Sequence, residues 1–304
     1  MKQKISLFLI IALIGIIKLQ AQNDAQMSHF MFNNISYNPA FAGANDLINA
    51  TFLHRTQWAG FKNAPSTQFL AGDMKLDRIG GVGLSIVNDK LGYEKALNVR
   101  LMYAYHHQIS EGFNISGGLG LGILNKSLDG SQLIYENMND VNAITTKESE
   151  ITPNIDFGLA GMYKDLTLGF SFSHVTQSLD KATFSKPPRH MYLFARYEIG
   201  VADQIDIVPS LYFKNSSFIS QFELNVLGVY DKKFWGGLTY RMQESLVIMA
   251  GVSVMNGIKI GYSYDLNTGP VKTYSNGSHE IMLSVGFKKP VKEEIPYRTP
   301  RIFN

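Results

Sequence analysis

The stretch Ile258-Lys259-Ile260-Gly261-Tyr262-Ser263-Tyr264-Asp265 shows the pattern that decides the fold. One set of alternate positions carries Ile, Ile, Tyr and Tyr, and the other carries Lys, Gly, Ser and Asp. Successive side chains of a strand point to opposite faces, so this period of two predicts a β-strand with one apolar and one polar face. The same alternation runs through residues 113–123 and 166–174.

Strand length and the charges on the polar face separate a membrane barrel from a soluble β-sandwich. The alternating segments run about nine to eleven residues or more, which a tilted strand needs to cross a bilayer, whereas sandwich strands usually have about five or six. Charged residues also occupy the middle of the polar face, namely Arg100, Asp156, Glu223, Arg241, Lys259 and Glu280. Such charges are costly in a soluble core but ordinary in a polar barrel lumen, so the pattern favours the barrel.

The segmentation of the chain predicts the number of strands and their orientation. Fourteen segments alternate, at residues 49–58, 65–75, 80–89, 95–108, 111–124, 152–163, 165–175, 189–200, 203–213, 217–230, 233–243, 245–255, 256–265 and 277–287. Bacterial single-chain barrels have even strand numbers, short periplasmic turns and longer outer loops. The connections after even-numbered segments are all short, and the two longest, residues 125–151 and 176–188, follow segments five and seven. The sequence therefore predicts an all-β, transmembrane antiparallel β-barrel of about fourteen strands, counted to within one hairpin because segments two and eight alternate poorly.

The regions outside the barrel have their own signals. Residues 1–21 combine a basic start, an apolar run and a small final residue, which is typical of a cleaved signal peptide. Residues 22–48 form no convincing strand, and we interpret them as a periplasmic or lumen-filling segment before the barrel of residues 49–287. The proline-containing residues 288–304 suit an extended tail. After the signal peptide no stretch of about 18 apolar residues occurs, so we expect an exported protein whose membrane spans, in the cell outer membrane, are strands.

The composition excludes several functions. The chain has no cysteine, and without the three lysines of the signal peptide its 25 bases balance its 25 acids, so it offers no thiolate site and no basic surface for nucleic acid. The glycines of Gly118-x-Gly120-x-Gly122 lie inside a strand, where they indicate space in the lumen more than a nucleotide loop. We predict no catalytic residue, no cofactor and no metal site. A hydrolase assembled from loop side chains such as His174 is the least favoured alternative.

Several short strings together resemble one family of outer-membrane proteins. In chain order they are Met31-Phe32-Asn33, Tyr37-Asn38-Pro39-Ala40-Phe41-Ala42-Gly43, Arg55-x-Gln57-Trp58-x-Gly60-Phe61, Ala64-Pro65, Asp89-x-Leu91-Gly92, Tyr103-Ala104-Tyr105, Trp235-Gly236-Gly237-x-x-Tyr240-Arg241, Gly261-Tyr262-Ser263-Tyr264-Asp265 and Gly277-Ser278-His279-Glu280-Ile281. Their order is similar to that of the PorP/SprF proteins of type IX secretion and gliding motility in Bacteroidetes. The resemblance implies a non-enzymatic component that delivers or retains a surface protein. It also implies two kinds of partner: periplasmic and lipoprotein parts of the secretion complex, and a cargo or adhesin with a C-terminal sorting domain. The predicted barrel adds outer-membrane lipid as a third partner.

The candidate site residues are those with a possible partner-docking or lumen role. They are Tyr37, Asn38, Pro39, Gly43, Arg55, Trp58, Arg100, Arg241, Lys259, Asp265 and Glu280. Asn38-Pro39 and Gly43 favour a rigid turn leading into the first strand, with a docking surface as the alternative.

The aromatic residues and the lumen charges suggest two further features. We expect Trp58, Phe61 and Trp235 in interfacial aromatic belts more than in a binding site. The lumen charges are balanced, which suggests a cross-linked or plugged interior. A passive porin-like channel is the runner-up function, and a soluble exported β-protein ranks third.

Overall fold

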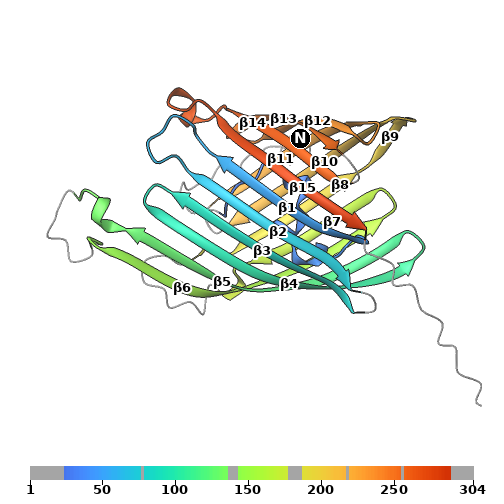
Figure 1. The fold of residues 1–304 in the computed structure, drawn as a ribbon, viewed down its shortest axis with the longest axis horizontal. Coiled ribbons are helices and arrows are strands. Elements are labelled where there is room, and N and C mark those ends of the chain that lie inside the picture. The colour runs from blue at the N-terminus through green and yellow to red at the C-terminus, as the bar shows by residue number, and fades with distance from the viewer. Residues whose placement is uncertain are drawn as a thin grey trace, which may run out of the picture.

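The chain forms a closed antiparallel β-barrel (Figure 1). The computed structural model describes residues 24–76, 79–135, 143–176, 187–216, 219–254 and 257–288. The strands are β1 (Leu47–Thr56), β2 (Ser66–Leu76), β3 (Gly80–Leu91), β4 (Glu94–Ser110), β5 (Phe113–Asp129), β6 (Lys147–Tyr163), β7 (Leu166–Ser173), β8 (His190–Tyr197), β9 (Ile199–Ala202), β10 (Ile205–Ser216), β11 (Ser220–Tyr230), β12 (Phe234–Arg241), β13 (Ser245–Val254), β14 (Ile258–Asn267) and β15 (Ser278–Lys288). The first and last strands pair with each other, with Arg55 opposite Glu280. Among the residues described, no helix is both long and apolar enough to cross a membrane.

The barrel has fourteen strands around its circumference, because two of the fifteen segments are parts of one strand. Both β8 and β9 pair with β10, one after the other along its length. Between them lies Glu198, whose N–H donates to the Asp165 carbonyl at 3.0 Å. The prediction of about fourteen strands is confirmed, and the weak alternation of segment eight coincides with this interruption.

The connections separate the barrel into two different ends. The longest connections, residues 130–146 and 174–189, follow β5 and β7, and both of these strands end at the same end of the barrel, which we call the long-loop end. The opposite, short-turn end has turns of two or three residues, such as residues 111–112 and 164–165. The predicted sorting of loops is confirmed, and the general rule for these barrels predicts that the long-loop end faces the cell exterior.

The two faces of the wall have opposite polarity. In β7, Leu168 points outward and is 47% exposed, whereas its neighbour Thr167 points into the lumen and is 7% exposed. The outward position of Ile260 and the buried position of Ser263 in β14 follow the same alternation. A wall that meets lipid on one side and polar groups on the other therefore explains the period of two in the sequence.

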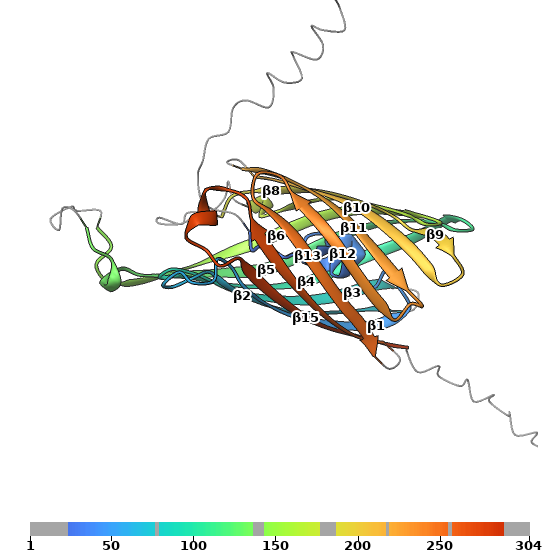
Figure 2. The same cartoon turned by 90° about the horizontal axis from the view of Figure 1, so that it is seen from above.

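Residues 24–46, which we call the lumen segment, lie inside the barrel except for the exposed Asn45 and Asp46 (Figure 2). They form three short 3₁₀ turns, η1 (Phe30–Phe32), η2 (Asn34–Ser36) and η3 (Pro39–Phe41). Asp24 contacts His174 at the long-loop end. Gly43 lies against the main chain of Gly81 at the short-turn end, so the segment runs through the length of the lumen. The predicted signal peptide and the tail beyond residue 288 lie outside the described residues.

Glycines on the inner wall make room for the lumen segment. A Cβ built on Gly118 of β5 would lie 2.4 Å from the Ala40 nitrogen, and one on Gly158 of β6 would lie 2.0 Å from Asn38 Oδ1. The glycine alternation in β5 therefore provides space in the lumen, as the sequence indicated. Gly43 itself has a φ of +63°, which favours glycine where the segment turns toward β1.

The expected position of Trp235 in an interfacial belt is wrong. Its side chain is 6% exposed and points inward from β12, with its ring centroid 4.6 Å from that of Phe32 and 5.7 Å from that of His29. The indole fits because Gly251 on the next strand has no side chain; a Cβ there would lie 2.0 Å from the Trp235 ring. Trp58 and Phe61 lie in the β1–β2 connection with their ring centroids 6.5 Å apart, and their place in a belt stays a prediction.

Candidate functional site

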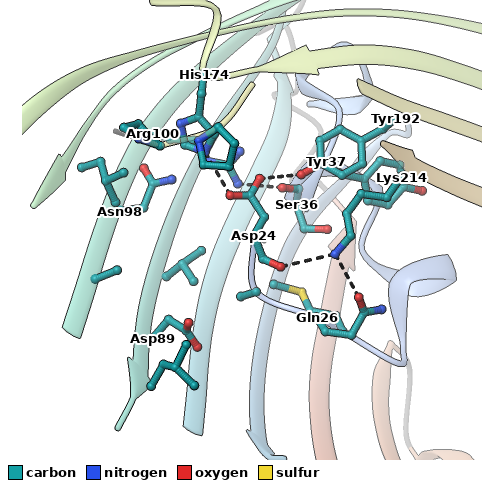
Figure 3. A pocket seen from close by; sticks show the side chains of 18 of the residues that line it. Asp24, Gln26, Ser36, Tyr37, Asp89, Asn98, Arg100, His174, Tyr192 and Lys214 are labelled. Carbon is teal, nitrogen blue, oxygen red and sulfur yellow. Dashed lines mark hydrogen bonds and ion pairs between the residues drawn. The ribbon is translucent and has the colours of Figure 1, made fainter. Parts of the chain in front are cut away.

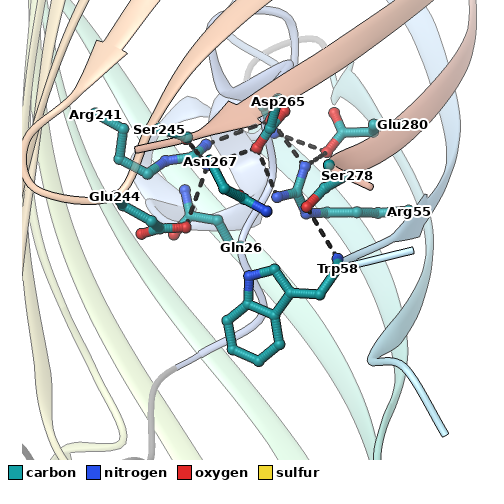
Figure 4. Close-up of polar contacts among 12 residues, drawn as sticks. Gln26, Arg55, Trp58, Arg241, Glu244, Ser245, Asp265, Asn267, Ser278 and Glu280 are labelled. Atoms are coloured by element: carbon teal, nitrogen blue, oxygen red, sulfur yellow. Dashed lines mark hydrogen bonds and ion pairs between the residues drawn. The ribbon is translucent and has the colours of Figure 1, made fainter. Parts of the chain in front are cut away.

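A network of buried charges lies inside the long-loop half of the barrel (Figure 4). Asp265 on β14 accepts from both Arg55 on β1 and Arg241 on β12, each at 2.7 Å from its Oδ2. All three side chains are 0–1% exposed. Such charges are stable away from water only when they are paired and hydrogen-bonded, so these strands depend on one another through Asp265.

The lumen segment completes this network. Ser28 and His29 donate their backbone N–H groups to the two carboxylate oxygens of Glu280, at 2.7 and 2.8 Å. His29 Nδ1 lies 2.6 Å from Glu280 Oε1. The Ser28 hydroxyl donates to Asp265 Oδ1 at 3.0 Å and accepts from Arg55 at 2.9 Å. The segment therefore satisfies polar groups that the wall alone would leave unpaired.

Three more wall charges, Arg100, Glu223 and Lys214, hold the segment further around the barrel. Arg100 on β4 pairs with Asp156 on β6 at 2.9 Å, and it also donates to the Ser36 carbonyl at 2.7 Å. Gln26 donates to Glu223 on β11 at 2.7 Å and accepts from Lys214 on β10 at 2.9 Å. Side chains from opposite walls thus converge on the same short segment.

The first described residue of the segment, Asp24, lies in a polar cluster at the long-loop end (Figure 3). Its Oδ1 is 3.0 Å from His174 Nε2, and its Oδ2 is 3.5 Å from His190 Nδ1 and accepts from the Tyr192 hydroxyl. Burial alone would raise the pKa of Asp24, but His190, His174 and the hydrogen bond from Tyr192 outweigh it and hold this pKa well below its usual value. Asp24 is therefore a carboxylate.

Cavities lie on both sides of the lumen segment. A cavity of about 160 Å³ at the long-loop end is lined by Asp24, Glu94, Lys126 and His174, among others. A cavity of about 350 Å³ at the short-turn end is lined by Leu47, Lys259 and Gly286, among others. The two share no lining residue, so the segment separates them.

The structure brings most of the candidate residues together in the lumen. Ten of them lie on the inner wall or in the lumen segment: Tyr37, Asn38, Pro39, Gly43, Arg55, Arg100, Arg241, Lys259, Asp265 and Glu280. Lys259 differs from the other charges because its ammonium lies over the Phe32 ring, 5.5 Å from the centroid. Trp58 lies apart from these ten, in the β1–β2 connection, where its backbone N–H donates to the Ser278 hydroxyl at 3.1 Å. Whether any of them docks a partner stays a prediction.

Sequence reasoning did not identify the polar residues at the beginning of the lumen segment. Asp24, Gln26, Ser28 and His29 belong to no recognisable motif, and apart from Arg55 the wall residues that bind them are more than 140 positions away. The one available signal was the excess of charges in the middle of the strands, which predicted a plugged lumen but not which residues would fill it.

Comparison with known proteins assigns the chain to a family. Residues 19–285 match the family described as type IX secretion system membrane protein PorP/SprF. The chain belongs to the PorP/SprF family. No curated protein sequence matches this PorP/SprF chain.

Solved structures resemble this PorP/SprF protein in fold. The Ralstonia pickettii toluene transporter TbuX has 10% identity and a TM-score of 0.50, over 85% of this chain and 93% of that one. The Pseudomonas aeruginosa FadL homologue has 12% identity and a TM-score of 0.44, over 83% and 92%. The Acinetobacter baumannii outer membrane protein Omp33 has 6% identity and a TM-score of 0.46, over 80% and 99%. The likeness to TbuX agrees with the barrel fold of this chain.

Proposed function

We propose that this PorP/SprF protein is a non-enzymatic outer-membrane component of the type IX secretion and gliding machinery, which delivers or retains a surface protein bearing a C-terminal sorting domain. Family membership supports a place in that machinery. The observation that carries the proposal is the filled lumen, because a passive pore needs a continuous water path. In the described part of the chain, residues 24–44 occupy that path and are held by Arg55, Arg100 and Glu280.

A barrel with a filled lumen can act through its two ends. The short-turn end would face the periplasmic and lipoprotein components of the complex, and the long-loop end would face the cargo or adhesin at the cell surface. The long-loop cavity carries both charge signs, with Glu94 and Lys126 paired at 3.2 Å on its wall, which suits a polar peptide segment. The outward apolar face meets outer-membrane lipid.

A deletion strain distinguishes this function from that of a channel. Loss of the protein should remove one or a few large surface proteins from the cell exterior and leave small-solute uptake unchanged. Crosslinking in wild-type cells should capture a periplasmic partner or the C-terminal domain of the cargo. An unchanged surface proteome combined with slower solute uptake would refute the proposal.

The alternative is a passive porin-like channel, which the two cavities at opposite ends favour. In that case the lumen segment would leave its position often enough for solutes to pass. Purified protein in planar bilayers separates the two functions. A large and steady conductance supports the channel, and little conductance supports the secretion component.

A further inference from the structure

Three possible metal ligands meet at the long-loop end of the lumen. Asp24 comes from the lumen segment, His174 follows β7, and His190 begins β8, and one ligand atom from each lies within 4.8 Å of the others. Asp24 and His174 are 150 positions apart in the chain. The three residues form no local sequence motif. They meet only because the barrel closes around the lumen segment.

The distances in the cluster suit a tetrahedral ion. Zinc binds imidazole nitrogen and carboxylate oxygen at about 2.0–2.2 Å, so two ligands of one tetrahedral zinc lie about 3.3 Å apart. The Asp24 oxygens are 3.0 Å from His174 Nε2 and 3.5 Å from His190 Nδ1. All three ligand atoms lie within 4.8 Å of one another, so an ion bound by all three would draw the two imidazole nitrogens together toward that tetrahedral spacing. Three protein ligands leave one position for water.

Surrounding groups hold Asp24 and His174 in place. The Tyr192 hydroxyl donates to Asp24 Oδ2, as the outer partners of metal-binding carboxylates do. The backbone N–H of His174 donates to Asp156 at 3.1 Å, and His174 has a φ of +56°, a conformation that an ordinary residue keeps only when its surroundings require it. His174 thus turns its ring into the barrel where the strand ends.

Both imidazoles are buried beside one carboxylate. The side chains of His174 and His190 are 4% and 0% exposed, and they share the single carboxylate of Asp24. Lys214 lies beside the cluster, with its ammonium 3.3 Å from the Asp24 carbonyl. Metal binds the neutral form of imidazole, so zinc would take the place of any proton on the ring nitrogens that face Asp24.

We propose that Asp24, His174 and His190 form a Zn²⁺ site that fastens the beginning of the lumen segment to the barrel wall. The site adds a metal link to the hydrogen bonds that already hold Ser28 and His29. It would fix the part of the segment nearest the long-loop cavity, which Asp24 and His174 also line. The proposal does not depend on the identity of any cargo.

Zinc binding by the full-length purified barrel in detergent tests the site. The protein is stripped with EDTA, titrated with zinc chloride, and its bound zinc is measured by elemental analysis after gel filtration. We expect one zinc per chain, and at least about tenfold weaker binding in the variants Asp24→Asn and His174→Ala. Zinc should also raise the unfolding temperature of the wild type and leave that of Asp24→Asn unchanged.

His107→Ala is the matched control. His107 is exposed on β4, so its loss should leave zinc binding as in the wild type. The Asp24→Asn variant keeps the shape of the side chain and so protects the test against a failure of His174→Ala to fold. Absence of zinc from the wild type at about 100 µM zinc overturns the proposal. The proposal is also overturned if Asp24→Asn and His174→Ala both bind one zinc per chain with an affinity within tenfold of that of the wild type.

Discussion

Substitution of Gly118 by valine should displace the lumen segment and leave the barrel intact. A Cβ at this position would lie 2.4 Å from the Ala40 nitrogen, where ordinary contact begins at 3.4 Å, so the overlap is about 1 Å (3.4 − 2.4). The Cβ is fixed by the main chain of residue 118, and the Ala40 nitrogen is itself a main-chain atom. Rotation of a side chain therefore cannot relieve this contact. Gly118 lies in β5 without a positive φ, so the strand itself accepts valine.

The size of the effect follows from what the segment loses. Overpacking of this kind typically costs about 1–3 kcal/mol, and each large apolar side chain that returns to water costs a further 1.5–3 kcal/mol or so. Phe30, Tyr37 and Phe41 are 2–4% exposed in the lumen. Re-exposure of any two of them would therefore add several kcal/mol against a docked segment.

The assay is conductance in planar bilayers, with gel mobility before and after boiling as the check that the barrel has formed. Gly118→Val should conduct more than the wild type while its mobility still changes on boiling. Gly161→Val is the control, because a Cβ at Gly161 on the neighbouring strand β6 meets no atom within 4 Å. A Gly118→Val barrel with wild-type conductance and wild-type thermal stability would refute the reasoning.

Three further predictions concern the charges, the lipid face and the orientation. Asp265→Asn keeps the shape of the side chain but removes the negative charge that the buried guanidinium groups of Arg55 and Arg241 share. It should therefore lower the free energy of unfolding by about 3–5 kcal/mol in a urea titration. A loss below about 1 kcal/mol would show that this charge network does not stabilise the barrel. Leu238→Lys places a charge on the outward face, where Leu238 is 53% exposed, and should cost about 2–4 kcal/mol in refolding if this position lies near the bilayer midplane, whereas Leu238→Met should be neutral. A cysteine at Ser131 should react with an impermeant thiol reagent on intact cells and one at Asp231 should not; the reverse result would invert the barrel.

The strands were predictable because each one lies between two different environments. In β14, Ile260 and Tyr262 meet lipid while Ser263 and Asp265 meet the lumen, so local polarity records the fold directly. The lengths of the connections then predicted which end of each strand lies at the long-loop end. Neither inference needed knowledge of distant contacts.

The interior was less predictable because its contacts are distant in sequence. The pattern placed Trp235 on a strand but could not show that Gly251 leaves a space for its ring on the inner side. Likewise, no spacing rule brings Asp24 to His174, since their contact exists only when the barrel surrounds the segment. The balanced charges predicted a filled lumen without identifying Ser28 and His29 as the groups that complete it.

The long reach of the lumen segment has a consequence for folding. The backbone of Ser28 and His29 binds Glu280 on the last strand, 252 and 251 residues further along the chain. Contacts of such high sequence separation form slowly and late. A nascent barrel that lacks β15 also lacks Glu280. The lumen segment can therefore bind fully only after β15 has paired with β1. The lumen segment is therefore fully bound only in a completely assembled barrel. In a chain truncated before β15, proteases should cleave the lumen segment more readily.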